Sequence, residues 1–473
     1  MYTGDPMNRY QRVRRLTPLI GVAALTVSLT VAATGASEAG KPTAALRPHV
    51  AARALPPGNA VVRWNAYVAA ATQAACIAPA DNPINESQIY AATQLAIHDA
   101  INAVDRRNRP YALHGSQPGA NLRAAAAAAA KNTLVAFINR IGAPVPQSCR
   151  DAGVDTAEAA YTHELGLIPD SNAKTLGIQV GEQAAAAIIA SRANDGSDTP
   201  LVVDTYPQGD EPGEYRFTPG TPFAFAPGWG HVTPWGLQSA GQFHVPPPFD
   251  LKSGAYLHDF RQVKRLGGDD VTTPSARSAE QTQIALFWLE NSPSEWNRIT
   301  RGLALQRHLG LWASARLFGL LDMAMADGYV STFYVKYDVY NFWRPVTAIQ
   351  LAATDGNPRT HADPTWTPLV TTPPIPDHDS GHSVEGGAAE AVLRGFFGTD
   401  SMAFSTCSYT LPVDCNATNP TTRSFTSFSQ AARENAWARV LIGFHFRHAT
   451  TTGRVHGMKI GRWMVGHYLQ PVH

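Results

Sequence analysis

The chain has 473 residues, which is enough for one or two packed units. Hydrophobic residues make up 44% of it and charged residues only 16%, a composition that excludes a disordered protein. Because 38 Lys and Arg balance 37 Asp and Glu, the net charge of +1 argues against nucleic acid as a partner, and any bound anion must be held by a local cluster of cations.

Residues 1–39 are expected to form a secretory signal peptide. Positive residues at Arg9, Arg12, Arg14 and Arg15 precede an apolar stretch over residues 16–34, and small residues follow it. An uncleaved membrane anchor is the alternative, because the stretch approaches the length that spans a bilayer. We expect a secreted or extracytoplasmic protein without stable membrane insertion after cleavage. The export route, Sec or Tat, stays open.

The four cysteines are compatible with export. Cys407 and Cys415 bracket a short segment that contains a proline and looks like a stapled loop, which leaves Cys76 and Cys149 to pair with each other. Four cysteines allow three pairings, however, and the sequence does not choose among them. Four free thiols are the alternative. No CxxC or His/Cys spacing indicates a zinc site.

Helical patterns dominate the chain after a flexible leader over residues 40–58. Ala-rich stretches with few β-branched residues in sequence predict the first helices, and no alternation typical of strands is sustained anywhere. The predicted helices cover residues 62–75, 87–104, 124–141, 173–192, 253–266, 278–290, 295–326, 383–397, 429–444 and 457–468. The predicted fold class is therefore all-α.

A Pro-rich segment interrupts these helices between Pro200 and Asp250. Its ten prolines exclude long regular elements, and aromatic residues such as Trp229 and Trp235 need burial, so we expect an ordered loop that packs on the protein. The loop belongs to a predicted N-terminal helical part over residues 59–300. A catalytic helical core is expected over residues 301–473.

Three segments of this predicted core carry residues suited to chemistry. The first runs from Lys336 to Arg344-Pro345. The third runs from Arg439 to His448 and has His445 in an apolar run, and the second is described below. A buried Arg cannot lose its proton and needs a partner, so an internal salt bridge is the simpler interpretation of either Arg. A lone His in an apolar run is more often a hydrogen-bonded core residue.

The second segment contains Ser380-Gly381-His382 directly before a predicted helix. Backbone N–H groups at a helix N-terminus can bind an anion, the serine adds a hydroxyl, and His382 can transfer a proton near neutral pH. An ordinary helix cap with a surface histidine is the alternative. Taken together, however, one Lys, two Arg, a helix start and two His could surround a tetrahedral oxyanion.

These three segments resemble the three-part signature of the vanadium-dependent haloperoxidases and the type-2 phosphatidic acid phosphatase superfamily. Residues 97–104 and the Pro-rich middle also resemble the bacterial haloperoxidase-like branch, so the resemblance covers most of the mature chain. It implies helical bundles with long connecting loops. It also implies a set of oxyanion-binding residues for vanadate or phosphate: Lys336, Arg344, Ser380, Gly381 and Arg439.

The resemblance assigns separate roles to the two histidines. His382 would be the general acid/base. His445 would be the axial vanadium ligand of a peroxidase, with vanadate as cofactor, or the phosphate-accepting nucleophile of a phosphatase, which needs no cofactor. The partners would be small molecules, namely hydrogen peroxide and a halide or a phosphate ester. The sequence specifies neither the halide nor an oligomeric state.

The chain departs from the family pattern at four positions. Seven residues separate Lys336 from Arg344 where six are usual, which in a continuous helix would rotate the lysine by about 100°. Asp379 replaces a proline, Ala438 replaces a serine, and Ala449 replaces the aspartate expected to orient His445, so that partner must come from elsewhere, for example from a backbone carbonyl. At the position that distinguishes chloride-using from bromide-using relatives, this chain has Ile375.

Three functions are compatible with these residues. The first is an exported vanadate-dependent haloperoxidase, and the second is a metal-independent acid phosphatase working through a phosphohistidine, which the missing aspartate at Ala449 weakens. The third is a non-catalytic anion-binding helical protein. A divalent-metal hydrolase built from His and Asp residues between 361 and 382 is a further alternative, but it leaves Arg344 and Arg439 unexplained.

Overall fold

The computed structural model describes residues 56–472, and the chain from Pro57 onward forms one compact unit. The predicted signal peptide and most of the predicted leader lie outside the described residues. The first helices are α1 (Ala60–Ala74), α2 (Pro83–Val104), α3 (Leu122–Arg140), α4 (Gln147–Gly166), α5 (Asn172–Ser191), α6 (Gly254–Leu266) and α7 (Ala279–Phe287). The remaining helices are α8 (Ser292–Gln306), α9 (Leu311–Tyr334), α10 (Pro345–Gln350), α11 (Gly381–Phe397), α12 (Phe428–Leu441) and α13 (Arg447–His467). The all-α prediction is confirmed.

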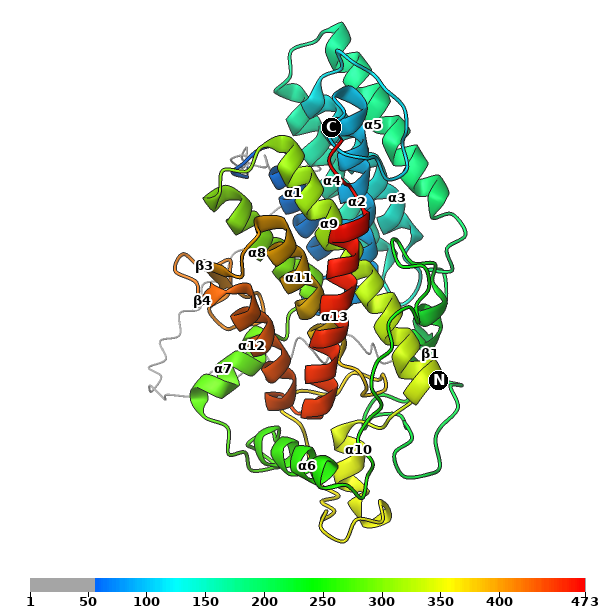
Figure 1. Cartoon of the computed structure of the whole chain (residues 1–473), viewed down its shortest axis with the longest axis vertical. Coiled ribbons are helices and arrows are strands. Elements are labelled where there is room, and N and C mark those ends of the chain that lie inside the picture. The colour runs from blue at the N-terminus through cyan, green and yellow to red at the C-terminus, as the bar shows by residue number, and fades with distance from the viewer. Residues whose placement is uncertain (1–55, 473) are drawn as a thin grey trace, which may run out of the picture. The chain divides into compact units, whose positions relative to one another are not determined.

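The helices form two groups that share α9. Helices α1 to α5 pack on one another, with α3 between α2 and α5, and they occupy the upper part of Figure 1. Helices α11, α12 and α13 form the second group, in which α11 and α13 lie side by side. Helix α9 contacts α2 in the first group and both α11 and α13 in the second. The three signature segments all follow α9 in the chain; the first directly follows α9, the second contains the start of α11, and the third contains the end of α12.

Close packing between α11 and α13 depends on glycines. A Cβ atom built on Gly453 would lie 2.7 Å from the Ser380 carbonyl oxygen, and one built on Gly457 would lie 1.8 Å from that of Val384. Real Cβ atoms do not approach oxygen this closely, so only glycine lets the two backbones touch at these positions. The start of α11, where Ser380 lies, is therefore held directly against α13.

The structure corrects several details of the predicted elements. The single helix expected over residues 295–326 is two helices, α8 and α9, separated by a turn that ends at Gly310, the N-cap of α9. Helix α4 was not expected, because its sequence is polar and only a narrow stripe of it is buried. Strands were not expected either, yet β3 (Ser401–Cys407) and β4 (Thr422–Ser427) form an antiparallel pair.

Two disulfides join the four cysteines. Cys76 pairs with Cys149 and thereby links the segment after α1 to α4, and Cys407 pairs with Cys415 at the end of β3. These are the pairs favoured by the stapled-loop interpretation.

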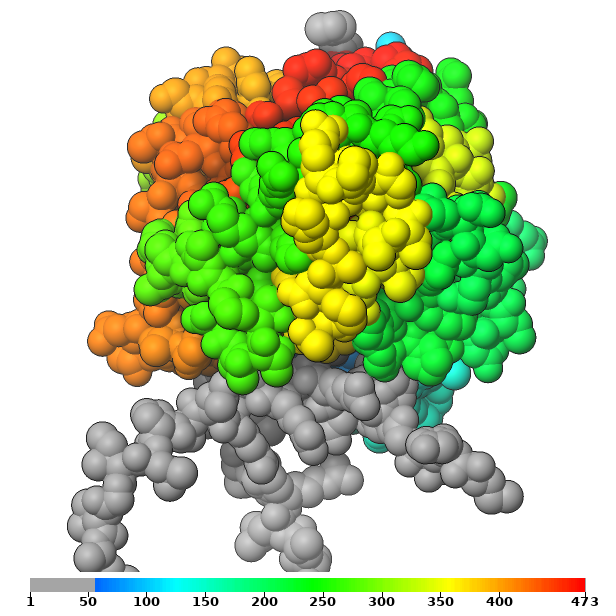
Figure 2. Space-filling view, turned by 90° about the horizontal axis from the view of Figure 1, so that it is seen from below, coloured from blue at the N-terminus to red at the C-terminus, as the bar shows by residue number. Residues whose placement is uncertain are grey.

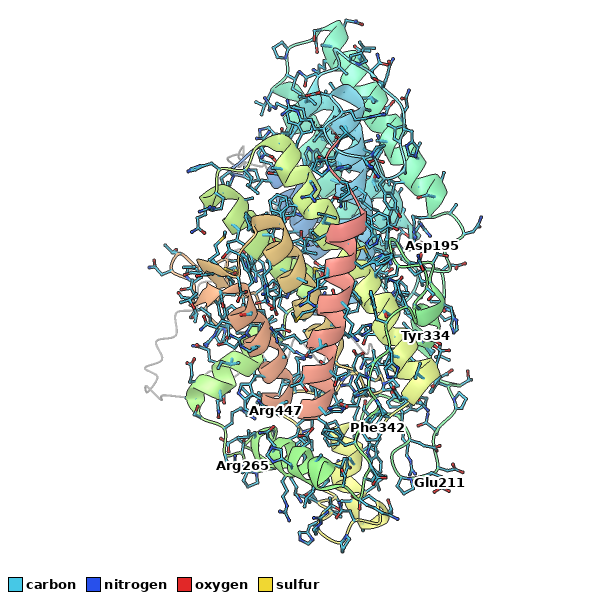
Figure 3. All side chains as sticks on the ribbon, in the orientation of Figure 1. Asp195, Glu211, Arg265, Tyr334, Phe342 and Arg447 are labelled. Atoms are coloured by element: carbon cyan, nitrogen blue, oxygen red, sulfur yellow. A yellow bond between two sulfur atoms is a disulfide. The ribbon has the colours of Figure 1, made fainter. Side chains whose placement is uncertain are left out.

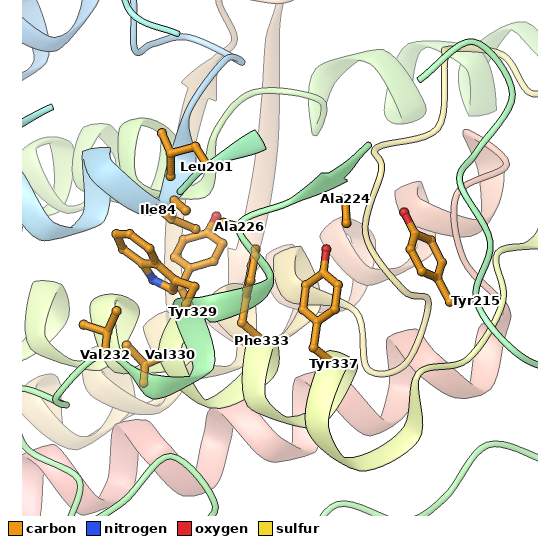
Figure 4. Packing of buried hydrophobic residues seen from close by; sticks show 11 residues of the cluster. Ile84, Leu201, Tyr215, Ala224, Ala226, Val232, Tyr329, Val330, Phe333 and Tyr337 are labelled. Atoms are coloured by element: carbon orange, nitrogen blue, oxygen red, sulfur yellow. The ribbon is translucent and has the colours of Figure 1, made fainter. Parts of the chain in front are cut away.

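The Pro-rich segment packs against the protein, as predicted. Its only regular elements are β1 (Val202–Val203), paired with β2 (Ala224–Phe225), and a short 3-10 helix (Pro227–His231). Trp229 and Tyr215 of this segment are fully buried and join a hydrophobic cluster with Tyr329 and Phe333 of α9. Figure 4 shows this cluster along the face of α9 that continues to Tyr337. The cluster fixes the end of α9, where the first signature segment begins.

Among the described residues, no helix has both the length and the apolar character needed to cross a membrane. In the space-filling view of Figure 2, the yellow part of the chain, which includes the neighbourhood of α10, reaches the surface between two green parts of the chain. The side chains of Phe342 and Arg447 lie close to α10 and to the start of α13 in Figure 3. Phe342 belongs to the first signature segment and Arg447 to the third.

Candidate oxyanion-binding and catalytic site

The three signature segments converge in the interior, where hydrogen bonds connect the first segment to both of the others. Lys336 donates hydrogen bonds from Nζ to the carbonyl oxygens of Pro376 (2.7 Å) and Asp377 (2.9 Å). Arg344 donates to the carbonyl oxygens of Ile375 (2.6 Å) and Phe444 (2.9 Å). The first segment therefore contacts both the second and the third, although more than a hundred residues separate its start from the end of the third.

Lys336 reaches the site because the helix changes its winding. Residues Val335–Tyr340 form a π-helical turn at the end of α9. A π turn accommodates one more residue than an α turn, and this is how the chain absorbs the seven-residue spacing before Arg344. Lys336 is fully buried, and its pKa is lowered well below the usual value by burial and by the charge of Arg344. The spacing therefore does not turn Lys336 away from the other candidates.

Arg344 is the N-cap residue of α10, and the fixed backbone of Pro345 starts that helix. Its guanidinium is buried and its Nη1 lies 2.8 Å from Nε2 of His445. Arg439, in the last turn of α12, is buried as well and donates from Nη1 to the Trp288 carbonyl oxygen at 3.0 Å. Backbone carbonyls thus orient both guanidinium groups.

Ser380, Gly381 and His382 form the start of α11. Ser380 is fully buried, does not cap the helix with its side chain, and accepts a hydrogen bond from Ser383 Oγ at 3.0 Å. A Cβ atom built on Gly381 would meet only Thr332 and Tyr329, at ordinary distances of 3.8 and 3.9 Å. Packing therefore leaves room beside the first N–H groups of the helix, where the macrodipole favours an anion.

His382 is a neutral histidine with a defined tautomer. Its Nε2 lies 3.2 Å from the Glu290 carbonyl oxygen, which can only accept, so Nε2 carries the hydrogen. Nδ1 is then the ring nitrogen that can accept a proton. Burial, followed by the charge of Arg439, lowers the pKa of His382 well below its usual value. This imidazole can act as a base at neutral pH.

His445 is also neutral, and Asp377 is its partner. The His445 Nδ1 atom lies 2.9 Å from Asp377 Oδ1, although without the alignment of an ideal hydrogen bond. Burial and the charges of Arg344, Lys336 and Arg439 lower the pKa of His445 well below its usual value. With Nδ1 directed to the carboxyl group, Nε2 is the ring nitrogen that accepts a hydrogen bond from Arg344 Nη1, because a guanidinium can only donate.

Asp377 was not identified from the sequence as the orienting group. Because Ala449 replaces the usual aspartate, the orienting group was expected to come from elsewhere, for example from a backbone carbonyl. In the structure it is a carboxyl group of the second segment. Burial raises the pKa of Asp377 to about 7, although Arg344 and Lys336 act in the opposite direction. Asp377 and Ala449 line one cleft, which shows that both face the same space.

Asp379, the other unusual carboxylate of this segment, is turned away from His445. Its Oδ2 lies 2.9 Å from His456 Nδ1, and its Oδ1 accepts a hydrogen bond of 2.7 Å from Thr332. Burial alone would raise its pKa, but the charge and hydrogen bond of His456 hold the pKa at about 2. Asp379 is therefore turned away from the proposed oxyanion-binding residues and is paired with a histidine.

The divalent-metal alternative lacks a suitable cluster. Within residues 56–472, no three or more His, Cys, Asp or Glu side chains are placed to share a metal ion. His378 instead donates to the Pro246 carbonyl oxygen at 2.8 Å, and Asp379 is engaged by His456. The arrangement of cations around neutral imidazoles fits an oxyanion such as vanadate or phosphate.

Comparison with known proteins finds similarity to vanadium-dependent enzymes. Residues 316–473 match the model of the second helical-bundle domain of vanadium chloroperoxidase. The vanadium chloroperoxidase of Curvularia inaequalis is 26% identical over 390 residues, which is 67% of this chain, and the chain spans 62% of that relative's length.

The fold also has solved counterparts. A bacterial vanadium-dependent iodoperoxidase is 25% identical, with a TM-score of 0.69 over 88% of this chain and 99% of the other. A bacterial vanadium-dependent chloroperoxidase in its apo form has a TM-score of 0.65 over 83% of this chain and 96% of the other, and at 16% identity it supports the fold alone. The matched bundle domain, the sequence relative and the shared fold show that the chain is similar to the vanadium haloperoxidases in sequence and in fold.

Proposed function

We propose that the chain is a vanadate-dependent haloperoxidase that oxidises halide with hydrogen peroxide. The observation that carries this proposal is the environment of His445: a neutral, buried imidazole whose pKa is lowered by burial and by three surrounding cations. Such a histidine can serve as the single protein ligand of vanadate, while Lys336, Arg344 and Arg439 hold the oxygens of the bound anion. Hydrogen bonds from Ser380 and the N–H of Gly381 complete this proposed set.

His382 and Asp377 have separate roles in this proposal. When bound, vanadate supplies the Lewis-acidic centre that activates hydrogen peroxide toward halide. His382 accepts a proton at Nδ1 while Glu290 fixes its other nitrogen. Asp377, 2.9 Å from His445 Nδ1, would orient the ring and leave Nε2 as the nitrogen that holds the anion. Asp377 and His445 are buried and His382 is partly buried, and the limited access of bulk water strengthens their electrostatic effect.

The test is oxidation of iodide and bromide by hydrogen peroxide, using protein stripped of anions and then reloaded with orthovanadate. Iodide comes first, because the iodoperoxidase is the solved structure with higher identity. We expect activity only after vanadate is added, competition by phosphate, no effect of EDTA, and loss of activity in His382→Ala and His445→Ala. Activity without vanadate, or activity that both variants retain, would contradict the proposal.

A phosphatase is the second candidate, and one observation favours it. A phosphohistidine mechanism needs a group that orients the nucleophile, and Asp377 supplies that group although Ala449 does not. Hydrolysis of p-nitrophenyl phosphate that is inhibited by vanadate, without halide oxidation, would establish this candidate. Anion binding with neither activity would leave the non-catalytic function.

We also propose that the protein is exported. Both disulfides support this location, since disulfides persist in oxidising compartments and are rare in the reducing cytosol. Mass spectrometry of the N-terminus of protein recovered from the culture medium or periplasm would test it. A mature N-terminus near residue 40 is expected, and retention of full-length chain in the cytosol would contradict the proposal.

A further inference from the structure

A second carboxylate–imidazole pair lies directly behind the oxyanion-binding turn. Asp379 precedes Ser380 and is fully buried, with His456 Nδ1 2.9 Å from its Oδ2. On the far side of the ring, His456 Nε2 lies 3.0 Å from Ser331 Oγ, and Ser331 donates its hydroxyl hydrogen to the Ala240 carbonyl oxygen at 2.5 Å. His456 and Ser331 are buried as well.

The hydrogen-bond pattern determines the charge of His456. An ionised carboxylate and a carbonyl oxygen can only accept hydrogen bonds. Because Ser331 has one hydrogen and gives it to Ala240, its oxygen must accept from His456 Nε2. Nδ1 must likewise donate to Asp379, whose pKa of about 2 keeps it ionised. His456 therefore carries both ring hydrogens and a positive charge.

The same pattern excludes a hydrolytic role for these residues. Asp379, His456 and Ser331 follow one another as in a Ser-His-Asp triad, but a catalytic serine gives its proton to the histidine. Here the serine hydrogen is engaged by Ala240, and the imidazole has no free lone pair. The arrangement is a charge pair with a fixed geometry.

The position of this pair next to Ser380 indicates its purpose. An unneutralised carboxylate buried one residue before an anion-binding turn would repel the anion, because charges interact strongly where water is excluded. We propose that His456 is the counter-ion that cancels the charge of Asp379 and, with Thr332, keeps that carboxylate turned away from the bound oxyanion. The proposal rests on the oxyanion-binding part of the function proposed above.

Packing places His456 where this role requires it. On α13 it lies between Gly453 and Gly457, the residues that let α13 touch the backbone of α11 at Ser380 and Val384. The close approach of the two helices at these glycines brings the imidazole beside the turn. His456 is a positioning residue in this account, because it acts on the anion only through Asp379.

Binding of orthophosphate and of orthovanadate to the anion-free full protein, measured by isothermal titration calorimetry, tests the proposal. His456→Gln keeps a neutral hydrogen-bond donor but removes the charge, so both anions should bind about tenfold more weakly. In His456→Gln/Asp379→Asn the repelling charge is gone too, and affinity should return to within about threefold of the original. A merely structural histidine would not be rescued in this way.

The matched control is His467→Gln, on the same helix, where the histidine is exposed and stacks on Trp463. It should bind both anions as the original protein does. If His456→Gln binds as tightly as the control, or if the double variant is as weak as the single one, the counter-ion role is wrong.

A second measurement separates this inference from the proposed function. Urea unfolding of the original protein, His456→Gln, Asp379→Asn and the double variant gives the coupling between positions 379 and 456 without any anion. Strong coupling is expected, and additive effects would overturn the ion pair. If the original protein binds neither anion, the proposed function fails, and the coupling still decides whether the pair exists.

Discussion

The structure contains two carboxylate–imidazole pairs whose aspartates, Asp377 and Asp379, are two residues apart in the sequence. The pairs differ in charge, because the imidazole of the first is neutral and the second is an ion pair. Asp377 contacts His445 at 2.9 Å and Asp379 contacts His456 at the same distance. His445 is neutral and the pKa of Asp377 is raised to about 7, whereas the pKa of Asp379 is held at about 2 and His456 has both hydrogens. The same two residue types therefore give a neutral site and an ion pair.

The surroundings explain the difference. Lys336, Arg344 and Arg439 lie around His445 and make a further positive charge on the imidazole unfavourable. His456 instead faces the Asp379 carboxylate and a serine oxygen that must accept a hydrogen. A histidine that is to bind a vanadium or phosphorus centre needs a free lone pair, and a histidine that is to cancel a carboxylate needs both protons. The cations around the first pair thus keep His445 neutral, as a histidine that is to bind such a centre must be.

The largest expected effect comes from removing the first imidazole. His445→Ala should abolish vanadate-dependent halide oxidation, by roughly a thousandfold or more, because the proposed ligand is lost. His456→Ala should reduce oxidation far less, since that ring acts through Asp379. Initial rates of iodide oxidation with saturating peroxide measure both. Equal losses in the two variants would break the functional distinction between the pairs.

The next effect concerns the carboxyl group of the first pair. Asp377→Ala should lower halide oxidation by about 10- to 100-fold, the usual cost of losing a group that orients a metal ligand. Adding Ala449→Asp should restore part of that loss, because positions 377 and 449 line the same cleft. Rates of the single and double variants decide this. No rescue would mean that a carboxylate at position 449 cannot reach His445 in this chain.

The two pairs also show how far the sequence alone predicts the site. The helical class, the Pro-rich segment and the convergence of Lys336, Arg344 and His445 follow from patterns and from the family resemblance. The partners of the histidines do not. Asp377 and His456 lie far along the sequence from the groups that they contact. The packing of α13 on α11 brings His456 to Asp379, and local sequence patterns do not reveal either contact.

Errors in the predicted elements have a similar origin. Helix α4 has a polar sequence, so its stabilisation depends on a narrow buried stripe and on the disulfide from Cys149 to Cys76, neither of which is visible as helical periodicity. The break between α8 and α9 was missed because its residues continue a helical composition up to Gly310. The π turn after α9 is another feature that local patterns do not reveal, although the unusual spacing pointed to an irregularity.

A smaller effect is expected from removing one cation, and it should make the first pair resemble the second. Lys336→Met takes away a positive charge that lowers the pKa of His445. The pKa of His445 should therefore rise toward its ordinary range, and vanadate affinity should fall about tenfold. NMR titration of the histidine ring signals in the anion-free protein measures the first change, with His467→Gln used to identify an exposed signal. An unchanged titration of His445 would show that burial alone keeps it neutral.

The last effect is on stability, not on activity or binding, and the two carboxylates should contribute to it with opposite dependence on pH. Asp379 has a folded-state pKa of about 2, below the value of about 4 in an unfolded chain, so its contribution is complete above about pH 4 and is lost as the pH falls toward about 2. For Asp377, with a folded-state pKa of about 7, the folded state binds the extra proton. Stability therefore declines as the pH rises from about 4 to about 7.

Urea unfolding of the anion-free protein across this range separates the two contributions, each on the order of 2–4 kcal/mol. Asp379→Asn should flatten the acidic part of the curve, and Asp377→Asn the part between about pH 4 and about pH 7. Each variant serves as the control for the other, because both remove one buried carboxyl group from the same segment. If both substitutions flatten the same part of the curve, the two carboxylates share one charge state. The contrast between a neutral site and an ion pair would then have to be abandoned.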